Sequence, residues 1–161
     1  MKYLSLGGAL LATALATSGW CAEPQKAGGE KAINGVWVPV SAVLAGKSMT
    51  AEECKDIHAV FHDGKYSVTV HGKLDKGTYT VDESKDPKQV TIVGTEGPNK
   101  GKTIPAIFDL EKDTLKVCYD MSGKAAPEKF ESKTDSSAFL VTYSKEDPSK
   151  SNKRIRKVID R

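Results

Sequence analysis

Alternating apolar and polar residues predict a β-hairpin in the first half of the chain. A run over 57–62 meets Asp63-Gly64, a dipeptide typical of two-residue hairpin turns, and a second run covers 65–71. Such a turn pairs Phe61 with Tyr66. The face expected to point into the core carries Ile57, Ala59, Phe61, Tyr66, Val68 and Val70.

Further short strands follow, and no long helical pattern separates them. The first segment, 36–44, is rich in β-branched residues and precedes a short helix over 51–55, because Thr50 and Glu53 form a capping-box pattern. A less regular strand is expected around Phe130. The other predicted strands cover 77–81, 89–93, 103–110, 114–119 and 138–143. About eight strands with short connections predict an all-β, antiparallel fold, either an up-and-down barrel or a sandwich.

The N-terminus has the layout of a secretory signal peptide. Lys2 provides a basic start, an uncharged apolar run follows over 4–16, and small residues occupy 16–19. This run is too short to span a bilayer. We therefore expect a signal peptide over 1–22, cleaved between 18 and 22, and export to the periplasm or the extracellular medium. A membrane anchor or a buried helix is the alternative. A flexible lead-in is expected over 23–32, which reads EPQKAGGEKA.

The charge balance argues against a nucleic-acid-binding protein. The 161 residues contain 24 Lys and Arg against 21 Asp and Glu, and most of the excess lies at the C-terminal end. The basic tail over 145–161 fits either contact with an anionic envelope surface or a solvated chain end. No apolar run after the leader is long enough for a transmembrane helix, so none is expected in the mature chain.

Several segments, in order, resemble the uncharacterised lipocalin-like domain that is abundant in planctomycetes. They read GVWVPVSA at 35–42, KY at 65–66, GTY at 77–79, EGPNKGKT at 96–103 and DTLKVCY at 113–119. The resemblance assigns one domain to 33–144 and implies a small, usually exported lipocalin-like barrel without an established activity. That family often has Arg-Pro where this chain has Ala126-Pro127, so no role of that arginine carries over.

True lipocalins also carry Gly-x-Trp on the first strand, with the tryptophan packed under a basic residue from the end of the barrel. Gly35 and Trp37 match the first part of this arrangement, and Lys145 follows the last predicted strand. The resemblance therefore implies that Trp37 packs under Lys145. Such an arrangement closes a barrel but identifies no ligand.

The cysteines allow two interpretations. The count depends on the cleavage point, and a cut that removes Cys21 leaves Cys54 and Cys118. An even pair in an oxidising compartment is compatible with a disulfide. Two unpaired, buried thiols that behave as small hydrophobic side chains are the alternative. Their spacing matches neither a zinc knuckle nor a redox CxxC motif.

No motif points to catalysis. The chain has no GxSxG elbow, HExxH pair, phosphate-binding loop or Asp-rich calcium loop. Its acidic residues fall mostly in turns, where solvated carboxylates are common. The three histidines offer no obvious third ligand to a metal ion. We therefore expect no enzyme, no metal site and no cofactor.

The barrel interior is the best candidate for a function. Eight-stranded barrels are either filled by their own side chains or hold one small ligand. Two functions stay open: binding of a small apolar or amphipathic ligand, and a filled barrel that contacts a protein or the envelope from outside. The aromatic residues expected to face inward and bind the ligand are Trp37, Phe61, Tyr66, Tyr79, Phe108 and Tyr119.

Overall fold

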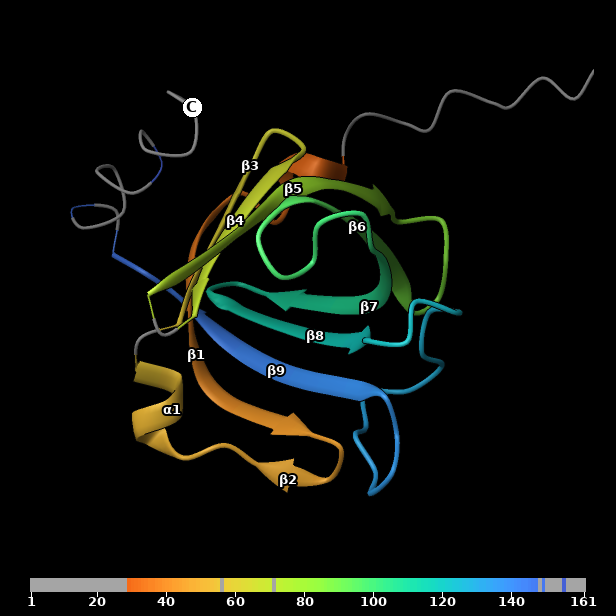
Figure 1. Ribbon diagram of the computed structural model, residues 1–161. Coiled ribbons are helices and arrows are strands. Elements are labelled where there is room, and N and C mark those ends of the chain that lie inside the picture. Colours follow the sequence, from red (N-terminus) through yellow and green to blue (C-terminus); the bar gives the residue numbers. More distant parts are fainter. Residues whose placement is uncertain (1–28, 56, 71, 148, 150–154, 156–161) are drawn as a thin grey trace, which may run out of the picture.

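The chain folds into a closed barrel of antiparallel strands (Figure 1), and the computed structural model describes residues 29–55, 57–70, 72–147, 149 and 155. Its elements are a 3-10 helix η1 (Gly29–Lys31), β1 (Gly35–Leu44), β2 (Lys47–Ser48), α1 (Ala51–Lys55), β3 (His58–His62), β4 (Lys65–Val70), β5 (Lys73–Asp82), β6 (Lys88–Glu96), β7 (Thr103–Glu111), β8 (Thr114–Asp120) and β9 (Ala138–Lys145). Strands β3 to β9 pair in chain order, and β1 pairs with both β3 and β9. The predicted all-β fold with one short helix after the first strand is confirmed.

The β3–β4 hairpin has the predicted register. Phe61 pairs with Tyr66 across it. Asp63 and Gly64 both have a positive φ, of 43° and 76°, which is the turn geometry that matches the twist of the flanking strands. Phe61 and Tyr66 point into the core as expected, whereas Val70, at the far end of β4, is partly exposed.

Closure of the barrel depends on β1, which pairs along both of its edges. Its start pairs with β3 from Gly35, and most of its length pairs with β9. The register shifts between Pro39 and Ser41. Such a bulge bends the strand and tolerates the missing N–H of proline. The pairing of β1 with β9 selects the barrel over the sandwich.

Two segments differ from the sequence prediction. β5 begins at Lys73 rather than at 77, because its pairing with β4 continues to the turn at Gly72. The strand expected around Phe130 does not form, and residues 121–137 are turns and irregular chain. Lys116 Nζ lies 5.2 Å from the centre of the Phe130 ring, so this segment packs against the outside of β8.

Asp120 anchors the irregular segment 121–137 at the end of β8. Its carboxylate accepts hydrogen bonds from the backbone N–H groups of Ser122, Lys124 and Ala125, and from the hydroxyls of Ser122 and Ser137. Burial by itself raises the pKa of Asp120. The hydrogen bonds from Ser137 and Ser122 lower this pKa by more than burial raises it, so it lies well below the usual range.

We expect Asp120→Asn to lower the free energy of unfolding by about 1–3 kcal/mol at neutral pH, the usual loss for hydrogen bonds to a charged group. Because the folded-state pKa is lowered, this stabilisation is fully present above the ordinary carboxyl pKa of 3.8. It is lost as the pH falls from there toward the folded-state pKa. Urea unfolding of both proteins across a pH series measures the difference, and a difference that does not shrink in acid would contradict the assignment.

One end of the barrel is closed by the chain that precedes β1. The Trp37 indole Nε1 donates a hydrogen bond of 2.8 Å to the carbonyl of Ile33. Lys145 Nζ lies 5.5 Å from the centre of the Trp37 ring. The predicted packing of Trp37 under Lys145 is therefore confirmed, and both Ile33 and Trp37 are buried.

Tyr79 holds the same end from the opposite wall. Its hydroxyl oxygen lies 2.8 Å from the carbonyl oxygen of Glu30 and 2.9 Å from Oδ1 of Asn34. Asn34 Nδ2 in turn donates to the Asp63 carboxylate in the β3–β4 turn. Residues 29–32, which we expected to belong to a flexible lead-in, are thus part of the barrel end.

Some predicted segments lie outside the described residues. These are the signal peptide over 1–22, the rest of the lead-in over 23–28, and most of the basic tail over 145–161. Among the described residues, no helix is long and apolar enough to cross a membrane.

Candidate functional site

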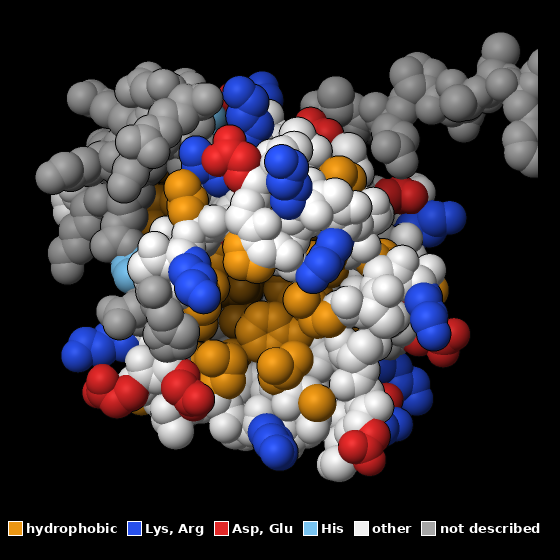
Figure 2. Space-filling model, viewed as in Figure 1, with side chains coloured by type: hydrophobic (Ala, Val, Ile, Leu, Met, Phe, Trp, Pro, Cys, Tyr) orange, Lys and Arg blue, Asp and Glu red, His pale blue; other side chains and the backbone are white. Residues whose placement is uncertain are grey.

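The other end of the barrel opens into a cavity of about 460 Å³. Chain direction alternates between neighbouring strands, so the β4–β5 turn, the β6–β7 loop and the β8–β9 connection share this end. All three contribute to the opening, which Figure 2 shows as an apolar hollow with lysine or arginine side chains on several sides. The lining residues are Phe61, Tyr66, Val68, Val70, Lys73, Asp75, Ile92, Pro98, Asn99, Ile104, Tyr119, Met121, Phe139 and Tyr143.

The cavity walls are mostly apolar. Val68, Ile92 and Ile104 face it from three different strands, and Phe139 stacks on Tyr119 with ring centres 6.0 Å apart. The exposed Lys73 stands at the rim, and none of the ion pairs among the described residues involves it. An apolar interior with few polar groups is typical of sites that bind small molecules.

Asp75 connects the wall of the cavity to the loop over its mouth. The Tyr66 hydroxyl donates to Asp75 Oδ2 at 3.0 Å. The backbone N–H of Asn99 donates to Oδ1 and its side-chain amide to Oδ2, each at 2.9 Å. Asp75 is 7% exposed, and three donors therefore satisfy its buried carboxylate. These bonds hold the β6–β7 loop against β5.

The sequence analysis did not identify Asp75 or Asn99. A usable signal existed for Asp75, because it lies in phase with Gly77, Tyr79 and Val81 when the period of two is extended backwards from the predicted strand. No comparable signal existed for Asn99, whose position follows from the fold of its loop.

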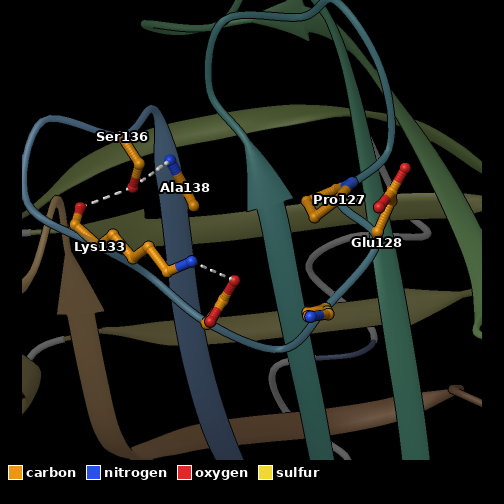
Figure 3. A pocket seen from close by; sticks show the side chains of 7 residues that line it. Pro127, Glu128, Lys133, Ser136 and Ala138 are labelled. Atoms are coloured by element: carbon orange, nitrogen blue, oxygen red, sulfur yellow. Dashed lines mark hydrogen bonds and ion pairs between the residues drawn. The ribbon is translucent and has the colours of Figure 1, made fainter.

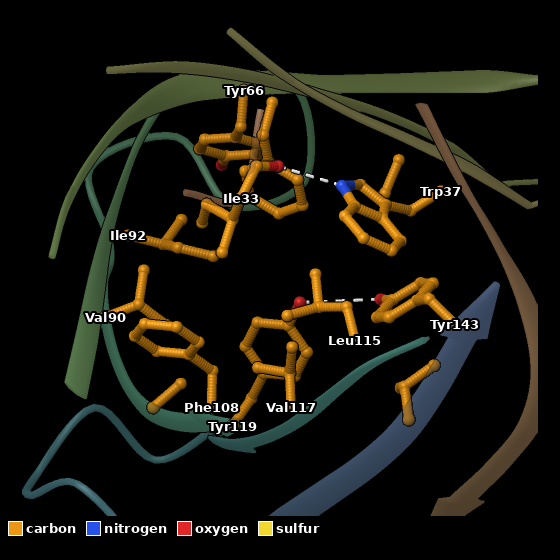
Figure 4. Close-up of a cluster of buried hydrophobic side chains, with 14 of the residues drawn as sticks. Ile33, Trp37, Tyr66, Val90, Ile92, Phe108, Leu115, Val117, Tyr119 and Tyr143 are labelled. Carbon is orange, nitrogen blue, oxygen red and sulfur yellow. Dashed lines mark hydrogen bonds between the residues drawn. The ribbon is translucent and has the colours of Figure 1, made fainter. Parts of the chain in front are cut away.

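Two tyrosine hydroxyls meet inside the barrel. The oxygens of Tyr119 and Tyr143 lie 3.4 Å apart (Figure 4), and both residues are buried. Burial raises the pKa of Tyr143 to about 12 and that of Tyr119 well above its usual value. Burial, and then the bond to Asp75, raise the pKa of Tyr66. All three phenols therefore keep their protons at physiological pH.

The six predicted ligand-binding residues fall into two groups. Phe61, Tyr66 and Tyr119 line the cavity. The others, Trp37, Tyr79 and Phe108, belong to the buried interior cluster but not to the cavity lining (Figure 4). Trp37 and Tyr79 instead seal the closed end, and the Tyr79 ring meets that of Phe61 edge-on, with ring centres 5.2 Å apart.

Of the two interpretations of Cys54 and Cys118, the disulfide does not form, and both residues are buried free thiols. Cys54 lies on α1 and belongs to the interior cluster. Cys118 points to the outer face of β8, where its Sγ lies 3.5 Å from the carbonyl oxygen of Glu131. The two thiols are on opposite sides of the barrel wall, so the structure shows the alternative of small buried hydrophobic side chains.

A second hollow, of about 340 Å³, lies on the outside beneath residues 127–138 (Figure 3). Two of its four charged residues pair, since Lys133 Nζ lies 2.9 Å from Glu131 Oε1. The Ser136 hydroxyl donates to the carbonyl of Lys133 at 2.7 Å. This hollow is more open than the barrel cavity and is lined by one irregular segment, and we do not regard it as the ligand site. The part of the chain that the structure describes also contains no cluster of three or more His, Cys, Asp or Glu residues suited to a metal ion.

No family model matches this chain, and neither does any curated protein. Among solved structures, the chain is similar to a DUF4847 family protein from Bacteroides vulgatus ATCC 8482. The two share 10% identity over 71% of this chain and 95% of that chain, with a TM-score of 0.43. The barrel assignment therefore rests on the strand pairing, and the resemblance to the planctomycete domain stays a prediction.

Proposed function

We propose that this protein is an exported, lipocalin-like binding protein, not an enzyme, that holds one small apolar or amphipathic molecule inside its barrel. The observation that carries the proposal is the apolar cavity of about 460 Å³ with one open end. Its volume falls within the roughly 300–1,000 Å³ typical of small-molecule sites. The signal-peptide pattern over 1–22 supports export.

The distribution of polar groups favours an amphipathic ligand. The charged Lys73 stands at the mouth, outside every ion pair among the described residues, whereas Val68, Ile92 and Ile104 form the walls. A molecule with an apolar body and a polar end satisfies both regions. The space left beside the side chains at the open end supports a bound ligand over the alternative of a filled barrel. Contact between the basic tail and the envelope stays a prediction.

A cavity-filling variant tests the proposal. We expect the wild-type protein to bind the apolar dye N-phenylnaphthylamine saturably, at one molecule per chain, with enhanced fluorescence. Val68→Trp places a bulky ring in the space that the dye would occupy, and the resulting overlap is expected to cost roughly 1–3 kcal/mol, which weakens binding about five- to 150-fold.

Val93→Trp is the matched control, since Val93 is 40% exposed on β6 and does not line the cavity. It is expected to leave dye binding unchanged. Thermal unfolding of both variants checks that the fold is intact. Absence of dye binding by the wild-type protein, or equal binding by Val68→Trp, would rule out the cavity as the site.

A further inference from the structure

The hydroxyl pair inside the cavity has one more donor than it uses. Tyr119 and Tyr143 each carry one O–H, and their mutual contact at 3.4 Å occupies only one of the two hydrogens. No other hydrogen bond to either hydroxyl is formed among the described residues. One O–H therefore has no acceptor in the part of the chain that the structure describes.

That hydrogen is buried and faces the cavity. Tyr119 is 8% exposed and Tyr143 is 4% exposed, and both line the cavity. In Figure 4 the two hydroxyls point toward each other across the barrel interior. A buried donor without a partner is costly, whereas an unused lone pair on the same oxygen costs less. The cavity therefore favours a guest that brings an acceptor over one that brings a donor.

The other polar groups of the cavity cannot supply this buried, uncommitted O–H donor. The Tyr66 hydrogen is committed to Asp75, and the Asp75 oxygens are occupied by Tyr66 and Asn99. Lys73 and Asn99 lie at the mouth. Tyr143 stands four residues further along β9 than Phe139, which is at the mouth, and strands advance about 3.3 Å per residue. The Tyr119 backbone is level with Phe139, because the two residues pair across β8 and β9, so the tyrosine pair extends from the mouth toward the interior of the cavity.

We propose that the protein selects its ligand by a neutral carbonyl-type oxygen at the end that enters the barrel, which accepts a hydrogen bond from the Tyr119–Tyr143 pair. The inference rests on the proposed function, because it requires a ligand in this cavity. It specifies the ligand as a ketone, ester, amide or similar group on an apolar body. An inserted carboxylate is disfavoured, since its charge has no cationic partner near the pair.

Two nearly isosteric compounds test the inference. Benzophenone and diphenylmethane differ by a carbonyl in place of a methylene, and each is measured by displacement of N-phenylnaphthylamine. Hydrophobic burial alone favours the hydrocarbon. We expect the wild-type protein to bind the ketone roughly three- to tenfold more tightly, the range for one net hydrogen bond.

Variants locate the hydrogen bond. Tyr119→Phe and Tyr143→Phe each leave one O–H, so each single variant is expected to retain a preference for the ketone. The double variant has no such donor and is expected to prefer the hydrocarbon. Val93→Trp, outside the cavity, is the control, and its preference should match that of the wild-type protein. Near-UV circular dichroism confirms the fold of each variant.

The outcomes separate the two proposals. If the dye does not bind, the proposed function fails and this inference fails with it. If the dye binds but the wild-type protein shows no preference for the ketone, only this inference is overturned. A preference that persists in the folded double variant also overturns it. Should the double variant not fold, the wild-type ratio and the two single variants still decide.

Discussion

Replacing Trp37 with alanine is expected to lower the free energy of unfolding by about 3–5 kcal/mol, the usual range for removing a large aromatic side chain from a core. Trp37 is 0% exposed and is the largest fully buried side chain among the described residues. Its loss also frees the Ile33 carbonyl, which accepts the indole hydrogen bond at 2.8 Å. The closed end would then lose both its packing and the bond that holds residues 29–34 over it. Chemical unfolding by guanidinium measures the change.

Two further variants separate the contributions of packing, the indole hydrogen bond and the Lys145 cation to this loss of stability. Trp37→Phe keeps part of the volume and removes the hydrogen bond, so its loss should be intermediate. Lys145→Met removes only the cation from the ring face, and an exposed cation–π contact contributes about 0.5–1 kcal/mol. If Trp37→Ala lost no more stability than Lys145→Met, Trp37 would not be the residue that secures the closed end.

A single methyl group added at Gly77 is expected to cost about 3 kcal/mol or more, above the usual cost of overpacking. A Cβ at this position would lie 1.9 Å from the Val93 carbonyl oxygen and 2.6 Å from Cε1 of Tyr66. Because the first contact is with backbone, relief requires β5 and β6 to separate. Gly77 adjoins the register shift between these strands. Displacement of Tyr66 would also alter the cavity wall, so Gly77→Ala should weaken dye binding as well.

Gly101→Ala provides the matched control for this prediction. Gly101 has a φ of +77°, and no atom lies within 4 Å of an added Cβ. Its substitution should cost about 1–2 kcal/mol through the left-handed backbone conformation alone. Comparison of the two melting curves separates steric contact from backbone preference, and equal losses would contradict the close approach at Gly77.

Local pattern was sufficient for the β3–β4 hairpin of this protein. The alternation over 57–71 and the Asp63-Gly64 turn specify both register and inward face, because a slip of one residue would expose every apolar side chain. The capping box at Thr50 likewise forms as expected, with Glu53 accepting from the Thr50 backbone N–H at 2.7 Å. The prediction for Trp37 and Lys145 came from family resemblance, not from local pattern.

Local pattern was misleading where a segment is held by tertiary contacts. Phe130 was expected in a strand, but its segment is held by the Asp120 carboxylate and by Lys116 on the outside of β8. Cysteine count allowed a disulfide, yet a count contains no information on which side of a barrel wall each thiol lies.

At the candidate site too, local pattern predicts part of the arrangement, and tertiary contacts determine the rest. Period-two alternation predicts that Phe61, Tyr66 and Tyr119 face inward, and it predicts the same for Trp37, Tyr79 and Phe108. It cannot tell which inward residues close an end and which surround a cavity, because that depends on position along the barrel axis and on what covers each end.

The sequence by itself determined most of the strands, most of their inward faces and the β3–β4 register, because these depend on residues adjacent in the chain. Only the tertiary structure decided that β1 pairs with β9, that residues 29–34 cover one end, and that Tyr119 and Tyr143 meet within the other half. Each of these contacts joins segments distant in the chain. Their formation depends on strand twist, barrel closure and side-chain packing together, and no local pattern encodes that combination.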